Sequence, residues 1–80
     1  MDNIQREVTA IVARVTKIPA SKLSPETNLK VEYNVDSLQG LQIVAALENK
    51  YDVRVPDEEI DLYTSIDSIT ETVRRLQSSN

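Results

Sequence analysis

Cysteine and histidine are both absent from this chain of 80 residues. Without cysteine the chain has no disulfide framework, and without either residue type it has no Cys/His zinc site. The same absences exclude the Ser–His and Cys–His pairs used in nucleophilic catalysis. Any thiol chemistry must therefore come from a group that is attached to the chain.

Large aromatic residues are also scarce, since the chain has three tyrosines and neither phenylalanine nor tryptophan. The core must be built from aliphatic side chains, and 40% hydrophobic residues suffice for one compact domain over residues 1–80. No apolar run approaches membrane-spanning length and the N-terminus has no apolar leader, so we expect a soluble, cytoplasmic protein. We also expect a monomer. The net charge of −4 argues against a nucleic-acid partner.

Hydrophobic periodicity predicts an all-α fold, a small four-helix bundle with three long helices and one short helix. The long helices are expected over residues 3–17, from Ser37 to Lys50 or Tyr51, and after a cap at Thr64 or Ser65. The apolar face of the last helix contains Ile66, Ile69, Val73 and Leu76. The short helix is expected just after Pro56, and short strands at Val53 and Val55 are the main alternative.

A long loop is predicted between the first two long helices, at residues 19–36, because it is rich in Pro, Ser, Thr and Asn. A loop of this length in a small domain must be anchored to the core. Asn34 suits a left-handed backbone conformation. The expected anchors are the apolar side chains Leu23, Leu29, Val31, Tyr33 and Val35.

The second long helix begins with a recognisable capping pattern. Asp36 is a good N-cap, and Gln39 lies three residues on, where it completes a capping box. Ser37 is then the first helical residue, and its hydroxyl is expected to point outward near the positive end of the helix dipole. A hydroxyl in this position is a good attachment point for a phosphodiester, because helix N-termini favour phosphate.

The sequence Asp36-Ser37-Leu38, with the helix that follows it and the later stretch Tyr51–Ile60, resembles acyl carrier proteins over nearly the whole chain. This resemblance implies that Ser37 carries 4′-phosphopantetheine from coenzyme A, whose thiol holds acyl groups as thioesters. It implies that Asp36 assists the phosphopantetheinyl transferase through the metal ion of that enzyme. It also implies acyl-processing partners such as ligases, ketosynthases and acyltransferases.

Helical geometry gives the predicted second helix two apolar faces. One face is expected in the core, and by resemblance it shelters an acyl chain, together with two residues from later helices. This pocket set is Gly40, Ile43, Val44, Leu47, Ile60 and Ile69. The other face is expected to dock partner enzymes, unless loop 19–36 folds over it, and acidic residues further on would steer them. This docking set is Leu38, Leu41, Ala45, Glu48, Glu58, Glu59 and Asp61.

Charge is distributed unevenly along the chain. Residues 1–35 carry five basic and four acidic side chains, whereas residues 36–61 carry two basic and seven acidic ones. Such a segment attracts basic partner surfaces, or simply forms a solvated acidic face. The run Asp57-Glu58-Glu59 is expected to splay around its helix, so no metal site and no catalytic residues are predicted.

Gly40 is the single glycine of the chain and lies inside the predicted helix. Glycine there costs about 1 kcal/mol relative to alanine, so something should compensate. We favour close packing of a neighbouring element against its backbone. The alternative is that Gly40 leaves space through which an acyl chain enters between the helices.

The cargo stays open between fatty acid, polyketide and specialised lipid synthesis. Carrier proteins of primary fatty acid synthesis are usually more acidic along this helix, where the chain has Gln39 and Gln42. An aminoacyl or peptidyl carrier is one rival function, although such carriers place glycines before the serine and Asn34-Val35-Asp36 has none. A helical protein-interaction module without a prosthetic group is the other.

Overall fold

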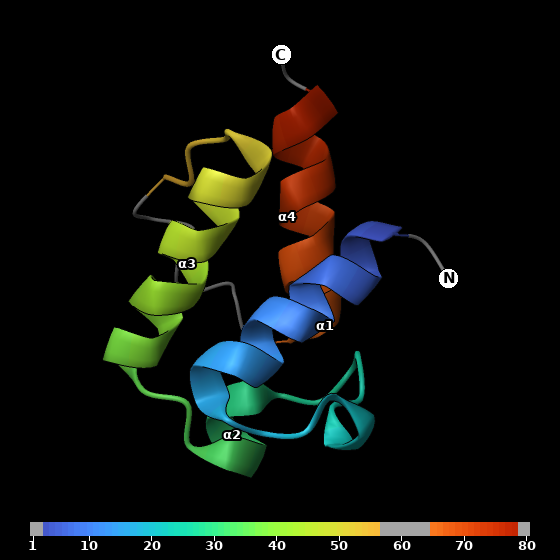
Figure 1. Ribbon diagram of the computed structural model, residues 1–80, viewed down its shortest axis with the longest axis vertical. Coiled ribbons are helices and arrows are strands. Elements are labelled where there is room, and N and C mark those ends of the chain that lie inside the picture. The colour runs from blue at the N-terminus through green and yellow to red at the C-terminus, as the bar shows by residue number, and fades with distance from the viewer. Residues whose placement is uncertain (1–2, 57–64, 79–80) are drawn as a thin grey trace.

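The computed structural model describes residues 3–56 and 65–78, and every regular element among them is helical (Figure 1). The elements are α1 (Asn3–Thr16), the 3₁₀ turn η1 (Ala20–Lys22), α2 (Leu29–Tyr33), α3 (Ser37–Tyr51) and α4 (Ile66–Ser78). This confirms the all-α prediction, and Val53 and Val55 form no strand within the described ranges. None of the helices described is both long enough and apolar enough to cross a membrane.

The core lies where the three long helices meet. Figure 1 shows α3 and α4 side by side, with α1 crossing in front of α4, and α1 packs against both of them. The helices meet through one cluster of aliphatic side chains, as the scarcity of aromatic residues requires. Its buried members are Val8, Ile11, Val12, Leu23, Leu29, Val35, Ile43, Val44, Leu47, Val55, Ile66, Ile69 and Val73.

The segment between α1 and α3 is more ordered than the loop that we predicted. It contains η1 and the five-residue helix α2, which is too short to produce a visible hydrophobic period. The side chain of Asn28 caps α2 by accepting hydrogen bonds from the backbone N–H groups of Lys30 and Val31, at 3.0 and 3.1 Å. Asn34 ends it with φ of 55°, so the predicted left-handed conformation is confirmed.

Four of the five expected anchors pack against the core. Leu23, Leu29 and Val35 are buried, and Tyr33 is half-buried with its hydroxyl donating to the carbonyl oxygen of Lys22 at 3.0 Å. The prediction for Val31 is wrong, because its side chain is 73% exposed. In a helix, a residue two positions after the buried Leu29 is rotated by about 200° and faces away from the core.

A second capping box starts α4. The backbone N–H of Ser65 donates to Ser68 Oγ at 3.0 Å, and the N–H of Ser68 donates to Ser65 Oγ at 3.1 Å. This confirms Ser65 as the cap of the last helix. The predicted short helix after Pro56 lies outside the described residues.

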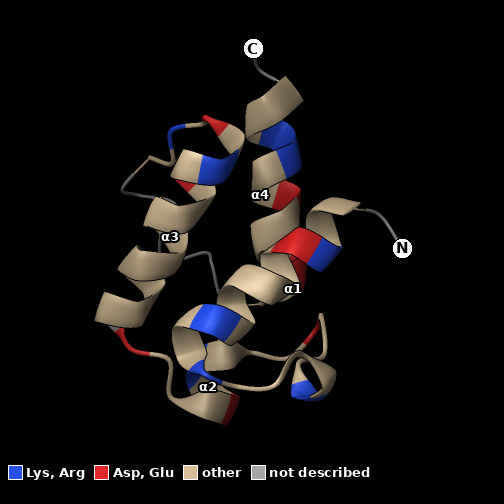
Figure 2. Cartoon of the chain, in the orientation of Figure 1, with Lys and Arg blue, Asp and Glu red and all other residues tan. Residues whose placement is uncertain are grey.

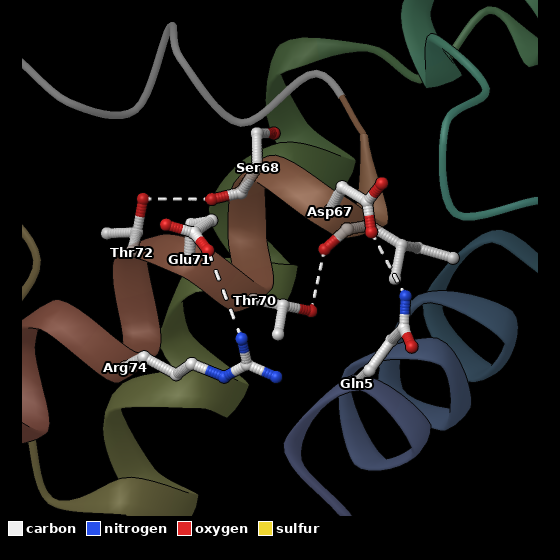
Figure 3. Close-up of polar contacts among 8 residues, drawn as sticks. Gln5, Asp67, Ser68, Thr70, Glu71, Thr72 and Arg74 are labelled. Carbon is white, nitrogen blue, oxygen red and sulfur yellow. Dashed lines mark hydrogen bonds and ion pairs between the residues drawn. The ribbon is translucent and has the colours of Figure 1, made fainter. Parts of the chain in front are cut away.

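Polar contacts also fix the start of α4 against the rest of the fold (Figure 3). Gln5 of α1 donates from Nε2 to Asp67 Oδ1 at 3.0 Å, and the N–H of Asp67 donates to the carbonyl oxygen of Pro25 at 3.0 Å. The buried hydroxyl of Thr70 donates to the carbonyl oxygen of Ile66 at 2.7 Å, so it carries no unsatisfied donor. α4 is therefore joined to α1 and to the 19–36 segment.

Candidate functional site

The start of α3 has the geometry that the sequence predicted. Asp36 Oδ1 accepts a hydrogen bond from the N–H of Gln39 at 2.8 Å, and the N–H of Asp36 donates to Gln39 Oε1 at 3.4 Å. These reciprocal bonds form a capping box, and Ser37 is the first residue of the helix. The outward direction of the Ser37 hydroxyl stays a prediction.

Beside this helix start, α3 exposes an apolar face. Leu38 is 64% exposed, Leu41 is 51% exposed, and Ala45 is exposed as well. Segment 19–36 therefore does not cover them. In Figure 2 the ribbon of α3 is tan from its start until near its C-terminal end, in agreement with the uncharged run at residues 37–47. The role of this face in docking stays a prediction.

Glu48, the last α3 residue of the docking set, has a local role that the sequence did not reveal. Its Oε2 accepts a hydrogen bond from the backbone N–H of Val55 at 2.8 Å, and the side chain is half-buried. The bond holds the turn after α3, where Asp52 adopts a left-handed conformation with φ of 53°. The other acidic members, Glu58, Glu59 and Asp61, lie outside the described residues.

The core side of α3 brings most of the pocket set together. Ile43, Val44 and Leu47 are buried, and they join Ile69 of α4 in the same cluster. Ile60 lies outside the described residues. These side chains form part of the packed core, and their contact with an acyl chain stays a prediction.

The close packing that we expected at Gly40 is not found among the described residues. Apart from its chain neighbours and the adjacent backbone of α3 itself, no heavy atom of the described residues lies within 4 Å of the position that a Cβ on Gly40 would occupy. Within residues 3–56 and 65–78, no neighbouring element packs closely against this glycine. The residue is half-buried, and its N–H donates to the carbonyl oxygen of Asp36 at 2.9 Å, as in an ordinary helix.

At its other end, α3 is tied to α1 by a polar cluster that the sequence reading missed. The hydroxyl of Tyr51 donates to Glu7 Oε1, and Lys50 Nζ lies 3.9 Å from Glu7 Oε2. Burial raises the pKa of Tyr51 above its ordinary value, and the hydrogen bond and charge of Glu7 raise it further. Tyr51 and Glu7 are 44 positions apart, so no local sequence pattern indicates their contact.

An open groove of about 450 Å³ lies between α1 and α3 beside this cluster. Ala10 and Ala46 leave room for it, and Arg14 and Lys50 line it together with Glu7. No sequence pattern indicated the groove. The described residues contain no group of three or more His, Cys, Asp or Glu side chains suited to a metal ion.

Comparison with known proteins identifies the family. Residues 6–73 match the family described as the phosphopantetheine attachment site. The chain belongs to this family. Its members carry covalently bound 4′-phosphopantetheine, so the match accounts for the resemblance of the Asp36-Ser37-Leu38 region to acyl carrier proteins.

Curated relatives of the chain have acyl carrier names. The acyl carrier protein of Buchnera aphidicola is 28% identical over 75 residues, which cover 94% of this chain and 96% of that protein. The meromycolate extension acyl carrier protein of Mycobacterium leprae is 27% identical over 73 residues, covering 91% of this chain and 64% of that protein. Mitochondrial acyl carrier protein 2 of Arabidopsis thaliana is 35% identical over 60 residues, covering 75% and 48%.

The start of α3 fits the family's prosthetic group. Asp36 and Leu38, on either side of Ser37, are both exposed. The first N–H groups of a helix have no intrahelical partner, and Asp36 engages that of Gln39. The amides of residues 37 and 38 thus suit a phosphate.

Proposed function

We propose that this chain carries acyl groups as thioesters on a 4′-phosphopantetheine arm attached to Ser37. The observation that carries the proposal is the capping box of Asp36 and Gln39, which makes Ser37 the first residue of α3. The exposed apolar face beside it supports the same function, because a carrier must be held by several enzymes in turn.

The chemistry at Ser37 is substitution at phosphorus. The hydroxyl oxygen of Ser37 forms the new bond to the phosphorus of the phosphopantetheine moiety of coenzyme A, and the adenosine 3′,5′-bisphosphate of coenzyme A leaves. When bound, the group supplies the thiol that the chain itself lacks. Asp36 holds the helix start in place and presents a carboxylate to the metal ion of the transferase. The role of the chain is carriage, and the catalysts are its partners.

Those partners are a phosphopantetheinyl transferase and acyl-processing enzymes. Leu38 and Leu41 would provide apolar contact area next to the arm. Ala45 and then Glu48 follow them along α3. Residues 37–47 carry no charge, which weakens steering toward strongly basic partners and favours recognition by apolar contact. This composition favours a dedicated polyketide or specialised lipid pathway at least as much as primary fatty acid synthesis.

The names of the relatives differ in the pathway and the compartment that they state. One of them is named for meromycolate extension and another is named as mitochondrial. We propose a cytoplasmic acyl carrier here, with acyl chains sheltered against the Ile43, Val44 and Leu47 side of α3 where the cargo is long enough.

Intact-mass measurement tests the proposal. The apo-protein is incubated with coenzyme A and a broad-specificity phosphopantetheinyl transferase, in parallel with Ser37→Ala and with Ser21→Ala as a control at an exposed serine elsewhere in the chain. Wild type and Ser21→Ala should gain one phosphopantetheine, and Ser37→Ala should gain none. No gain by folded wild type with several transferases would contradict the proposal and leave a helical interaction module. A gain by Ser37→Ala would place the attachment elsewhere.

A further inference from the structure

The open groove between α1 and α3 has a form that suits a third helix. Its apolar lining consists of Ala10, Ala46 and the buried Ile11, and small side chains of this kind let another helix approach closely. Along α1 the groove runs from Glu7 to Arg14, which is about 10 Å, or about two turns of helix. All the residues that line it belong to the described part of the chain. A short helical segment of another protein can therefore lie in it.

The groove continues the exposed apolar face of α3. Ala45 and Asn49 each lie within about 20° of Leu38 around the helix, and all three are exposed. Asn49 also lines the groove. Leu41, by contrast, is rotated by about 140° from Ala46. A partner that follows α3 from Leu38 toward the C-terminal end thus reaches the groove, whereas a partner seated on Leu41 alone does not.

The charges at the rim of the groove are mainly positive. Arg14 is exposed, and no hydrogen bond or ion pair engages its guanidinium within the described part of the chain. Lys50 Nζ lies 3.9 Å from Glu7 Oε2, so this pair is loose, and 45% of the Lys50 side chain stays exposed. The hydroxyl of Tyr51 donates to the other oxygen of Glu7. Both cations are therefore available to another molecule, in a chain whose net charge is −4.

We propose that this groove is a docking site for an acidic, amphipathic helix of a partner protein. The apolar side of that helix would pack against Ala10 and Ala46, and its carboxylates would pair with Arg14 and Lys50. Charge complementarity selects this occupant, because a basic helix would place its cations against those of the groove. Such a partner has the opposite charge to the basic surfaces that the acidic segment of residues 36–61 attracts.

Two designed peptides serve as probes of the full-length apo-protein. Each is a helix of about 18 residues, long enough to form in water, with alanine and leucine along one face. The flanks of that face carry glutamate in one peptide and lysine in the other. Backbone amide shifts at low salt should show about fivefold tighter binding of the glutamate peptide, with changes at Ala10, Arg14 and Asn49. The net charge of −4 attracts the lysine peptide to the chain as a whole, so this preference can come only from a local basic site.

Substitutions on α1 separate the groove from general charge effects. Arg14→Glu should weaken binding of the glutamate peptide about fivefold or more and strengthen binding of the lysine peptide. Arg6→Glu is the matched control, because it makes the same change of charge at an exposed arginine of α1 outside the groove. Ala10→Leu should also weaken binding, since its side chain fills the groove, and Ala20→Leu is the control at an exposed alanine of η1. Thermal melts check that each variant is folded.

Contrary results would overturn the proposal in different ways. Equal or tighter binding of the lysine peptide, no binding of the glutamate peptide, or equal losses in Arg14→Glu and Arg6→Glu would exclude a specific acidic partner. Shift changes confined to Leu38 and Leu41 would assign binding to that face alone. Self-association of the chain that Arg14→Glu abolishes, measured by analytical ultracentrifugation, would make a second copy the occupant. The docking needs no prosthetic arm, so a failure to load Ser37 would contradict only the proposed carrier function.

Discussion

The two faces of α3 carry similar aliphatic side chains, but one face is buried and the other is exposed to solvent. On one face Leu47 is fully buried, and Ile43 and Val44 join it in the core between the long helices. On the other face Leu38 and Leu41 keep more than half of their surface in solvent. Burial of an apolar side chain stabilises a fold by roughly 1.5–3 kcal/mol. Of the two faces, only the first therefore contributes substantially to the stability of the fold. The second face is the one that we propose for contact with partner enzymes.

The largest expected effect follows from truncating the buried face. Leu47→Ala should lower the free energy of unfolding by about 2–5 kcal/mol, because it removes a fully buried side chain and leaves a cavity. A small domain has about 5–15 kcal/mol in total. Urea denaturation measures the change, with Leu41→Ala as the matched control on the same helix, expected within about 0.5 kcal/mol of wild type. Equal losses in the two variants would abolish the distinction between the faces.

Truncating the exposed face should affect binding more than folding. Leu41→Ala should weaken the complex with a phosphopantetheinyl transferase about tenfold, or about 1.4 kcal/mol, as expected for an apolar contact near the centre of an interface. The dissociation constant can be measured by isothermal titration calorimetry. Val31→Ala is a suitable control, because Val31 is the most exposed of the large apolar residues described but lies on α2. If both variants bind equally weakly, the docking surface extends beyond α3.

Asp36 is the N-cap of α3, at the end of the helix where both faces begin. Substitutions of Asp36 can separate its effect on folding from its effect on recognition. Asp36→Ala should lose about 1 kcal/mol of stability, because it removes the acceptor for the N–H of Gln39. Asp36→Asn keeps a capping oxygen and should stay close to wild type in thermal melts. Both variants should be loaded more slowly, since both lack the carboxylate. Wild-type loading rates in Asp36→Asn would limit the role of Asp36 to capping.

Local patterns predicted the fold and the start of the site well. The capping boxes at Asp36–Gln39 and Ser65–Ser68 follow from residues three apart, and the ends of α3 follow from its apolar period. Such features depend only on residues that are close together in the chain, so they can be predicted from the sequence.

The features that the sequence missed depend on neighbours in space or on very short elements. Helix α2 has five residues, which are too few to show a hydrophobic period. We therefore predicted a loop there and wrongly expected Val31 to anchor it to the core. The bonds from Tyr51 to Glu7 and from Val55 to Glu48 depend on where the chain folds back. The lack of a close neighbour at Gly40 among the described residues likewise depends on how the elements are placed in space.

The smallest expected effect concerns the C-terminal end of the buried face, where Tyr51 joins α3 to Glu7 of α1. Tyr51→Phe should lower the stability at neutral pH by about 1 kcal/mol, the usual contribution of one hydrogen bond. The pKa of Tyr51 is raised from its ordinary value of 10.0 in the folded state. Above about pH 10 the unfolded chain therefore loses this proton while the folded chain keeps it.

The sign of the pH dependence follows from this difference in bound protons. Because the folded state binds more protons than the unfolded state, the stability of wild type falls as the pH rises above about 10. Tyr51→Phe lacks this loss, so the gap between the two proteins should be largest at pH 7–9 and should shrink by pH 11. Urea denaturation at each pH measures it, and Tyr33→Phe, which removes a hydroxyl bonded to a backbone carbonyl, is the matched control. A gap that stays constant with pH would mean that the Tyr51 hydroxyl ionises equally easily in both states, and that Glu7 does not hold this end of α3 through the proton of Tyr51.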